Sequence, residues 1–482
     1  MKNSILLTVF AGLSCVLAAC SSTGGPLGLS PAQEKQIGLQ EHPKILAAYG
    51  GEIANPEIRA YADDLTRRLL AGSAQPTADI KMTVLDSPVV NAFALPGHVY
   101  ITRGLLALAN SEAELAGVIG HEIGHVFERH TAERVSRSNV TGIGAALAGI
   151  LSGNAQTAEA IGQAAQLYLL SYNRNQEYEA DSVGVRLLAN SGYDPLAAAY
   201  FLNTLGRWSA LEGQIAGRER PPEFLSTHPN SANRVREAAE QAQVIETTGR
   251  KEINRDRYLN LIDGLLFGED AYAQGYIQGN TFVHPEIRFA FAVPEGFQLQ
   301  NSTSAVLARS QSGAQMQFTI TGGQGTPQEI LEGPMSQQLK TDFRPVQNGQ
   351  VNGRPAAVGR GQLQTQQGNL DLTGYVIDWD GEAKYVFLWV TPPNLTRQLS
   401  GPINQSVNTL QQVNPARLNV PPTRQIDVVT ARRGDSVRSL ARGMAFPSYQ
   451  EQRFRIINGL ANEGAMPAGA KVKVIGTKPR NY

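Results

Sequence analysis

The residues best suited to chemistry in this chain are His121, Glu122 and His125, which form the pattern His-Glu-x-x-His. Residues four apart lie on one face of an α-helix, one turn above each other, so both imidazoles can point at a single metal ion. Glu122 then lies where it can accept a proton from a water bound to that ion. The pattern therefore predicts a metal-dependent hydrolase, with zinc as the expected metal.

The sequence around this motif favours a buried helix. Ser111 and Glu114 have the spacing of a capping box, which starts a helix. Apolar residues then recur at helical spacing, namely Leu115, Val118, Ile119, Ile123 and Val126. A surface helix with exposed His and Glu would match the five-residue motif alone, but the apolar face favours a buried site.

A catalytic zinc ion needs three protein ligands and one open position for water. We expect the third ligand on a second helix, within residues 173–181. Glu177 and Asp181 are four residues apart and share a helix face, so one carboxylate can bind the metal while the other holds a ligand histidine through its second ring nitrogen. Glu179 points to another face. Without the first motif, the same carboxylates would fit a solvated acidic face.

Two motifs in order carry a specific resemblance. His-Glu-x-x-His at 121–125, followed by Asn-x-x-x-Glu-x-x-Ala-Asp at 173–181, resembles the gluzincin family of CAAX prenyl endopeptidases and HtpX-type proteases. Further segments resemble its periplasmic branch, the BepA-type outer-membrane quality-control metalloproteases; they are residues 91–97, residues 102–105, and Ser226-Thr227-His228-Pro229 with Arg234. The resemblance covers about residues 30–240.

This resemblance implies roles for individual residues. Glu177 is the implied third zinc ligand, Asp181 the implied partner of His121, and Asn173 a further residue beside the ligands. His228 is implied to take the open position of the zinc and so displace the catalytic water. Arg234 is implied to stabilise the developing oxyanion.

The remaining histidines have weaker signals. From the sequence alone, His228 also fits an ordinary loop histidine before proline. His130 lies one and a half turns past His125, on a different helix face, and is not expected to be a ligand. We expect structural or surface positions for the others, which have no partner pattern: His42, His98 and His284.

Segments near the motif suggest how a substrate could be held. Residues 89–102 predict an edge strand with a bend at 96–97, on which an extended peptide could pair by β-augmentation; an ordinary hairpin is the alternative. Residues 140–170 predict an apolar helical hairpin, either beside the cleft or packed in the core. Residues 206–224 predict a loop that carries His228 toward the metal.

The N-terminus predicts the compartment. Lys2, the apolar residues 5–16 and Leu17-Ala18-Ala19-Cys20 form a secretory signal that resembles a bacterial lipobox. Cys20 would become the lipidated first residue, and Ser21 after it fits sorting to the outer membrane; a plain signal peptide is the alternative. We therefore expect a periplasmic protein anchored to the outer membrane through a membrane-inserted lipid.

Composition narrows the partners and the metal ligands. The chain has 482 residues, with 42 basic and 42 acidic side chains and a formal net charge of +0, and no basic array for nucleic acid. Its 2 cysteines are Cys15, in the signal, and Cys20, so the zinc site uses no thiolate. We expect one zinc ion per chain and protein or peptide substrates of the cell envelope.

A chain of this length predicts several domains. We expect a multidomain architecture: a signal peptide at 1–19, a tether at 20–30, a mainly α zincin-like metallopeptidase domain with a small edge sheet at 31–267, a linker at 268–282, an α+β domain with an antiparallel sheet at 283–412, a linker at 413–424 and a LysM-like βααβ module at 425–477. Strand signals at 288–293, 316–320 and 385–390 support the α+β domain.

The C-terminal resemblance rests on residues 433–437, 457–460 and 467–472, which are similar to a LysM module. Such modules pack two helices on a two-stranded sheet and commonly bind glycans that contain N-acetylglucosamine. The middle of this segment, residues 443–455, is longer and more charged than usual. Peptidoglycan is therefore one expected partner, and a structural copy without glycan binding is the alternative.

These predictions together favour a zinc-dependent endopeptidase for misfolded or stalled envelope proteins. One alternative is a chaperone or assembly factor for outer-membrane proteins, with proteolysis held silent by His228. Another is a peptidoglycan-associated binding protein in which the C-terminal module sets the function.

Overall fold

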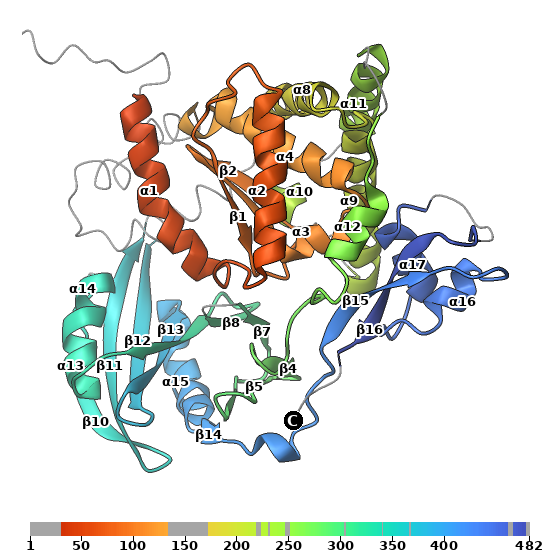
Figure 1. Ribbon diagram of the computed structural model, residues 1–482. Helices are drawn as coiled ribbons and strands as arrows, with labels where there is room; N and C mark the ends of the chain where they lie inside the picture. The colour runs from red at the N-terminus through yellow and green to blue at the C-terminus, as the bar shows by residue number, and fades with distance from the viewer. Residues whose placement is uncertain are drawn as a thin grey trace, which may run out of the picture.

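The computed structural model describes residues 30–133, 172–217, 223–229, 232–245, 251–302, 305–339, 341–365, 368–460 and 466–478. The signal peptide, Cys20, nearly all of the tether and the hairpin expected at 140–170 lie outside these ranges. Among the described residues, no helix combines the length and apolar character that a membrane span requires. Figure 1 shows a helical N-terminal part, a β-rich middle part and a small C-terminal part.

The N-terminal part is mainly helical. Its helices are α1 (Pro31–Ala48), α2 (Pro56–Ala71), α3 (Arg103–Leu108), α4 (Glu112–Phe127), α8 (Arg174–Asn190), α9 (Ala197–Ala216), α10 (Glu223–Thr227), α11 (Ala232–Val244) and α12 (Arg255–Leu261). Its strands are β1 (Lys81–Leu85), β2 (Ala92–Leu95) and β3 (His98–Thr102). This content agrees with a mainly α peptidase domain that carries a small sheet.

The small sheet has the order β1-β3-β2, with β1 parallel and β2 antiparallel to β3. β2 and β3 form a hairpin that turns at Pro96 and Gly97, where glycine adopts a φ of 76°. β2 is one of the two edge strands of this sheet, and all four of its residues are buried. The expected edge strand and the alternative hairpin are therefore the same element.

Helix α4 begins where the sequence predicts, and it is buried from Glu112 to His125. The side chain of Ser111 accepts a hydrogen bond from the backbone N–H of Glu114 at 3.1 Å. The Glu114 carboxylate, however, accepts from the backbone N–H of Asn110 at 2.9 Å, so it does not complete the reciprocal half of the capping box. The N-cap bond of Ser111 is therefore present, but the Glu114 carboxylate binds the backbone N–H of Asn110 and not that of Ser111.

The prediction of a loop at residues 206–224 is wrong for most of the described part of this segment. Residues up to Ala216 continue helix α9, which ends at Gly217 with a left-handed φ of 63°. The helix continues because Leu211 is buried and Trp208 packs against the same core. His228 comes directly after the short helix α10, which ends at Thr227.

The middle part contains two antiparallel sheets. Its strands are β4 (Tyr276–Gln278), β5 (Thr281–His284), β6 (Phe289–Ala292), β7 (Phe297–Asn301), β8 (Val306–Ser310), β9 (Gln315–Gly322), β10 (Val346–Val351), β11 (Arg354–Thr365), β12 (Gly368–Asp378), β13 (Ala383–Thr391) and β14 (Gln411–Gln412). The large sheet has the order β10-β11-β12-β13-β9-β8-β7, and the small one β14-β6-β5-β4. The segment expected as a linker at 268–282 already contains β4, because β4 pairs with β5.

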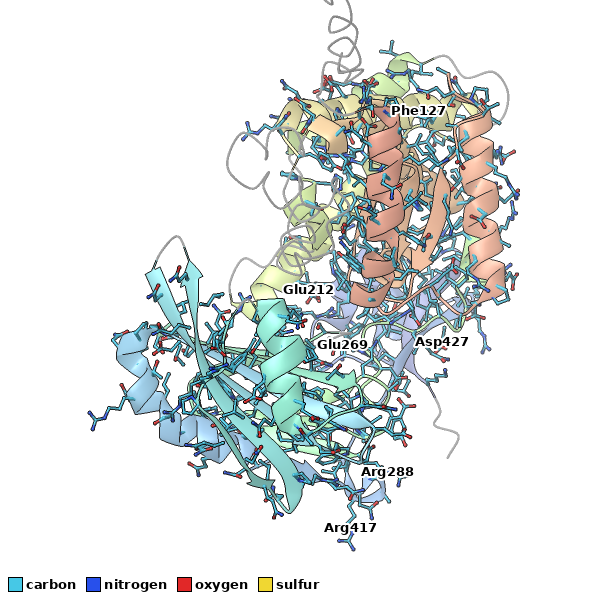
Figure 2. All side chains as sticks on the ribbon, turned by 90° about the vertical axis from the view of Figure 1, so that its left-hand side faces the viewer. Phe127, Glu212, Glu269, Arg288, Arg417 and Asp427 are labelled. Atoms are coloured by element: carbon cyan, nitrogen blue, oxygen red, sulfur yellow. The ribbon has the colours of Figure 1, made fainter. Side chains whose placement is uncertain are left out.

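Helices cover both faces of the large sheet. An aromatic cluster that includes Phe291, Phe318 and Trp389 packs under α15 (Pro393–Val407). A second cluster lies on the opposite face, under α13 (Pro327–Ile330), a π-helical turn at Leu331–Met335 and α14 (Ser336–Leu339). A 3-10 turn at Pro415–Arg417 follows. In Figure 2, Arg288 and Arg417 lie at the bottom of the middle part, whereas Phe127, the last residue of α4, lies at the top of the molecule.

The C-terminal part has the βααβ order that the sequence predicts. Its elements are β15 (Arg424–Thr430), α16 (Val437–Ala441), α17 (Gln450–Ile457) and β16 (Lys471–Thr477), and the two strands pair antiparallel. Glycan binding by these elements stays a prediction.

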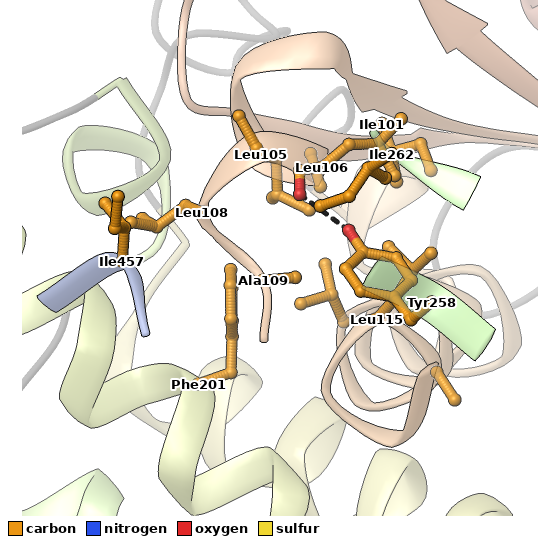
Figure 3. Packing of buried hydrophobic residues seen from close by; sticks show 14 of the residues in the cluster. Ile101, Leu105, Leu106, Leu108, Ala109, Leu115, Phe201, Tyr258, Ile262 and Ile457 are labelled. Carbon is orange, nitrogen blue, oxygen red and sulfur yellow. Dashed lines mark hydrogen bonds between the residues drawn. The ribbon is translucent and has the colours of Figure 1, made fainter. Parts of the chain in front are cut away.

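This C-terminal part is not a separate module on a linker. Its buried side chains belong to the same hydrophobic cluster as those of the helical N-terminal part, and Ile457 lies beside Leu108 in Figure 3. In the same view, the Tyr258 hydroxyl of α12 donates to the carbonyl of Leu106 at 2.6 Å. The backbone of residues 264–267 also hydrogen-bonds to β15. The C-terminal part therefore completes the core of the helical N-terminal part.

Lys473 on β16 links the C-terminal part to the end of helix α3 by hydrogen bonds. Its side chain is 0% exposed, and its ammonium donates to the carbonyl oxygens of Ala107, Leu108 and Ala109 at 3.0, 3.3 and 2.6 Å. These carbonyls end helix α3, where the backbone has no helical partner of its own. Lys473 thus satisfies the backbone immediately before helix α4.

We expect Lys473→Ala to lower the free energy of unfolding by roughly 3–5 kcal/mol, because it leaves three buried carbonyl oxygens without their hydrogen-bond donor. Urea unfolding followed by circular dichroism measures this change. Lys478→Ala removes an exposed lysine just beyond β16 and is the matched control. Equal unfolding midpoints for the two variants would contradict the role assigned to Lys473.

Candidate metal centre and active site

The close packing of α4 against α8 brings the candidate ligands together (Figure 1). Small residues make this contact: a Cβ at Gly124 would lie 3.0 Å from the Cα of Ala180, and one at Gly120 would lie 3.2 Å from the Cα of Gly184. Larger side chains would push the two helices apart. The carboxylates of α8 can therefore reach the histidines of α4.

Four buried side chains converge at this contact: His121 and His125 of α4, Glu177 of α8, and His228 directly after α10. One ligand atom from each lies within 4.8 Å of the others. The Nε2 atoms of His121 and His125 are 3.0 Å apart, and they lie 3.7 and 3.6 Å from the Glu177 carboxylate oxygens. Two imidazoles and one carboxylate are the ligand types of a catalytic zinc site.

The electrostatic surroundings suit a metal site. Burial lowers the pKa of His121, which keeps its ring neutral and able to bind a metal. Burial also raises the pKa of Glu177 to about 7 against the opposing effect of Arg234. A divalent cation beside Glu177 would favour the ionised carboxylate. The donor set therefore fits zinc.

Glu122 lies at the candidate general-base position. Its side chain is 0% exposed, and its Oε1 is 3.6 Å from Nε2 of His228. The sequence placed it next to the first ligand on the same helix, and the structure keeps it beside the ligand cluster. A carboxylate there can exchange a proton with a molecule bound among the ligands.

Asp181 holds His121 from the side away from the cluster. Its Oδ1 lies 2.9 Å from Nδ1 of His121, and Arg234 donates to both of its oxygens at 2.8 and 2.7 Å. Burial alone would raise the pKa of Asp181, but Arg234 and the hydrogen bonds from Arg234 and His121 hold it well below its usual range. The carboxylate therefore stays ionised and can orient the His121 ring.

Two predicted residues, Arg234 and Asn173, make contacts that the sequence analysis did not specify. Arg234 is 2% exposed and pairs with both Glu177 and Asp181, so its guanidinium orients these two carboxylates. Its expected role toward an oxyanion stays a prediction. Asn173 caps helix α8 by accepting the backbone N–H of Gln176 at 3.0 Å. It positions Glu177 only by starting the helix that carries it. The contacts of Arg234 cannot be read from sequence spacing, whereas Asn173 and Gln176 have the spacing of a capping box.

Sequence reasoning missed several neighbours of the ligands. Nδ1 of His130 lies 2.9 Å from Nδ1 of His125, although His130 itself is outside the ligand cluster. Tyr172 stacks on His125 with ring centroids 3.7 Å apart, and Phe224 stacks on His228 at 4.6 Å. No spacing rule signals these contacts, because each joins different elements or follows a break in a helix.

The other histidines lie elsewhere. Nδ1 of His42 is 2.9 Å from the hydroxyl of Tyr100, and the rings of His42 and His98 stack. His284 packs against Phe289 in the middle part. These structural positions are those that the sequence predicts.

The site is closed in this conformation. His121 is 5% exposed, and Glu122, His125, Glu177 and His228 are each 0% exposed. His228 belongs to the cluster, and the ring of Phe224 stacks on it. A polypeptide could reach Glu122 only after such side chains move.

Comparison with known proteins supports a peptidase. Residues 56–242 match the model of peptidase family M48. Over 168 residues the chain is 36% identical to the mitochondrial metalloendopeptidase OMA1 of Arabidopsis thaliana, covering 34% of this chain and 32% of that protein. Over 224 residues it is 30% identical to the beta-barrel assembly-enhancing protease of Escherichia coli (strain K12), covering 44% of this chain and 45% of that protein. The chain thus spans less than half the length of each of these two relatives.

The likeness to solved structures is weak. The solution structure of cyanobacterial PsbP (CyanoP) from Synechocystis sp. PCC 6803 aligns with a TM-score of 0.24 and 10% identity, covering 29% of this chain and 98% of that chain. The family match covers α4 and α8, and with them the buried cluster of two imidazoles and a carboxylate. Residues 56–242 therefore resemble a metallopeptidase domain of family M48.

Proposed function

We propose that the chain is a zinc-dependent endopeptidase that hydrolyses peptide bonds with Glu122 as general base. One observation carries this proposal: ligand atoms of His121, His125 and Glu177 meet within a buried cluster, with the Glu122 carboxylate beside it. Both zinc and the assignment of these three side chains as its ligands are part of the proposal.

The chain's own residues divide the work. A zinc ion held by His121, His125 and Glu177 would lower the pKa of a bound water and polarise the peptide carbonyl. Glu122 accepts the proton of the attacking water and returns it to the leaving amine. Arg234 holds the carboxylates in place by its pairs with Glu177 and Asp181. Because Glu122 acts as a base, no covalent bond to the enzyme is needed.

His228 is the proposed plug of this site. Its Nδ1 lies 3.0 Å from the Glu177 carboxylate and 3.2 and 3.3 Å from Nε2 of His121 and His125. It thus occupies the fourth corner of the cluster, where a catalytic site keeps an open position. Its other ring nitrogen faces Glu122. Proteolysis therefore requires that His228 leaves this corner.

The proposed setting is the periplasmic face of the outer membrane, with Cys20 lipidated. The signal and lipobox pattern of residues 1–20 supports this location. Misfolded or stalled envelope proteins are the proposed substrates, because one relative is named a beta-barrel assembly-enhancing protease. Unfolded chains also suit a site that must accept an extended backbone.

The closed site favours a second candidate function. A chain whose metal cluster is covered by His228 can act as a chaperone or assembly factor without cutting its clients. This candidate differs from the first in one respect, which is whether hydrolysis through Glu122 is needed for activity in the cell.

We expect Glu122→Gln to lower casein cleavage by roughly 10²–10⁴-fold, because the amide cannot accept the proton. Metal analysis should give the same zinc content as the wild type, since Glu122 is not a proposed ligand. A chelator should abolish wild-type cleavage, and added zinc should restore it.

Glu128→Gln is the matched control, since Glu128 is exposed at the end of the same helix. The comparison is repeated in a His228→Ala background, so that a closed site cannot hide the effect. Unchanged cleavage by Glu122→Gln would exclude the proposed mechanism. Full rescue of a deletion strain by Glu122→Gln would favour the chaperone.

We expect His228→Ala to raise casein cleavage by roughly tenfold or more, because the competent population increases when the plug is removed. Initial rates at equal zinc content measure the effect. His284→Ala, in the middle part, is the control for losing a histidine. A fall in rate with intact fold and zinc would make His228 a catalytic residue and not a plug.

A further inference from the structure

The two histidines of α4 are held by different partners. Both present Nε2 to the cluster, so each has Nδ1 left for a second contact. Nδ1 of His121 lies 2.9 Å from the Asp181 carboxylate, whereas Nδ1 of His125 lies 2.9 Å from Nδ1 of His130. The partner of His125 is therefore another imidazole.

The protonation of this second contact follows from the ligand geometry. A histidine that binds a metal through Nε2 carries its proton on Nδ1. Nδ1 of His125 is then the donor, and Nδ1 of His130 must accept. His130 consequently carries its own proton on Nε2, which lies 3.0 Å from Oε2 of Glu179. This arrangement supplies a donor and an acceptor at both contacts.

We propose that His130 is a positioning residue for the zinc ligand His125, and that Glu179 fixes the His130 tautomer. This inference rests on the proposed zinc site. It adds a chain of contacts that runs from the buried ligand to a carboxylate whose side chain is 59% exposed. A ligand histidine with such a partner is oriented and made more basic.

His130 reaches His125 because helix α4 ends just before it and the chain changes direction. The helix ends at Phe127, and Arg129 adopts a left-handed φ of 56°. Its guanidinium pairs with Glu34 of α1, with Nε 2.9 Å from the carboxylate. The chain therefore turns back after α4, and the His130 ring, 2% exposed, reaches His125 five residues earlier.

Neighbouring contacts limit other orientations of the two rings. Tyr172 stacks on the face of His125 at an interplanar angle of 13°. The hydroxyl of Thr131 donates to the carbonyl of Ala94 at 3.2 Å, which ties the segment after Arg129 to β2. The His125 ring is thus held on its face by an aromatic ring and on its edge by His130.

The experiment measures zinc affinity of the full-length protein by competition with a chromophoric chelator, together with the visible spectrum of the cobalt-substituted protein. His130→Leu removes the acceptor and is expected to weaken zinc binding by roughly 10–100-fold. It should also change the cobalt spectrum, because the His125 ring is no longer held. His130→Asn keeps an acceptor near the Nδ1 position and is expected to recover part of the affinity.

Two further variants complete the design. Glu179→Ala is expected to weaken zinc binding by less than His130→Leu, since Glu179 acts through His130. It changes an exposed residue, so it decides the question if both His130 variants fail to fold. His284→Leu controls for histidine loss far from the site.

The outcomes separate this inference from the proposed function. A wild-type protein that binds no zinc overturns the proposed site, whatever the variants do. Zinc binding by the wild type with equal affinity and an equal cobalt spectrum in folded His130→Leu overturns the positioning role of His130. If His130→Leu does not fold, unchanged zinc affinity in Glu179→Ala has the same consequence. A loss of thermal stability without a change in zinc affinity would make His130 a packing residue only.

Discussion

The contact between α4 and α8 is the constraint on which the site depends. Gly120 and Gly124 on one helix meet Gly184 and Ala180 on the other, so the two backbones come within van der Waals contact. At this separation, Glu177 reaches the histidine pair from a different part of the chain. A Cβ or larger group at these glycines would separate the carboxylate from the imidazoles.

That contact also forces several charges into the interior, and the structure compensates them by pairing. Arg234 lies between Asp181 and Glu177, and Asp181 in turn contacts His121. Burying unpaired charges is costly, whereas a network of paired groups retains its charges and its geometry. In this network Arg234 pairs with both carboxylates and holds them in position.

The part of the chain that carries the metal cluster also needs residues far from its sequence motifs. Lys473, near the C-terminal end, satisfies the carbonyls just before α4, and the C-terminal part shares the core of the peptidase part. The middle part has its own aromatic core. The chain therefore places a β-rich domain between its N-terminal and C-terminal parts, which fold together. Helix α4 depends on contacts from both of these parts.

The sequence by itself determined the features that depend on local periodicity. The pairs His121 and His125, and Glu177 and Asp181, follow from the four-residue spacing of a helix, and strand alternation located β6, β9 and β13. Tertiary structure alone decided the partner of His130, the contacts of Arg234 and the docking of Lys473. Each of these joins segments through a helix break or across a long separation in the chain. Such contacts arise from the packing of whole elements, which no local spacing encodes.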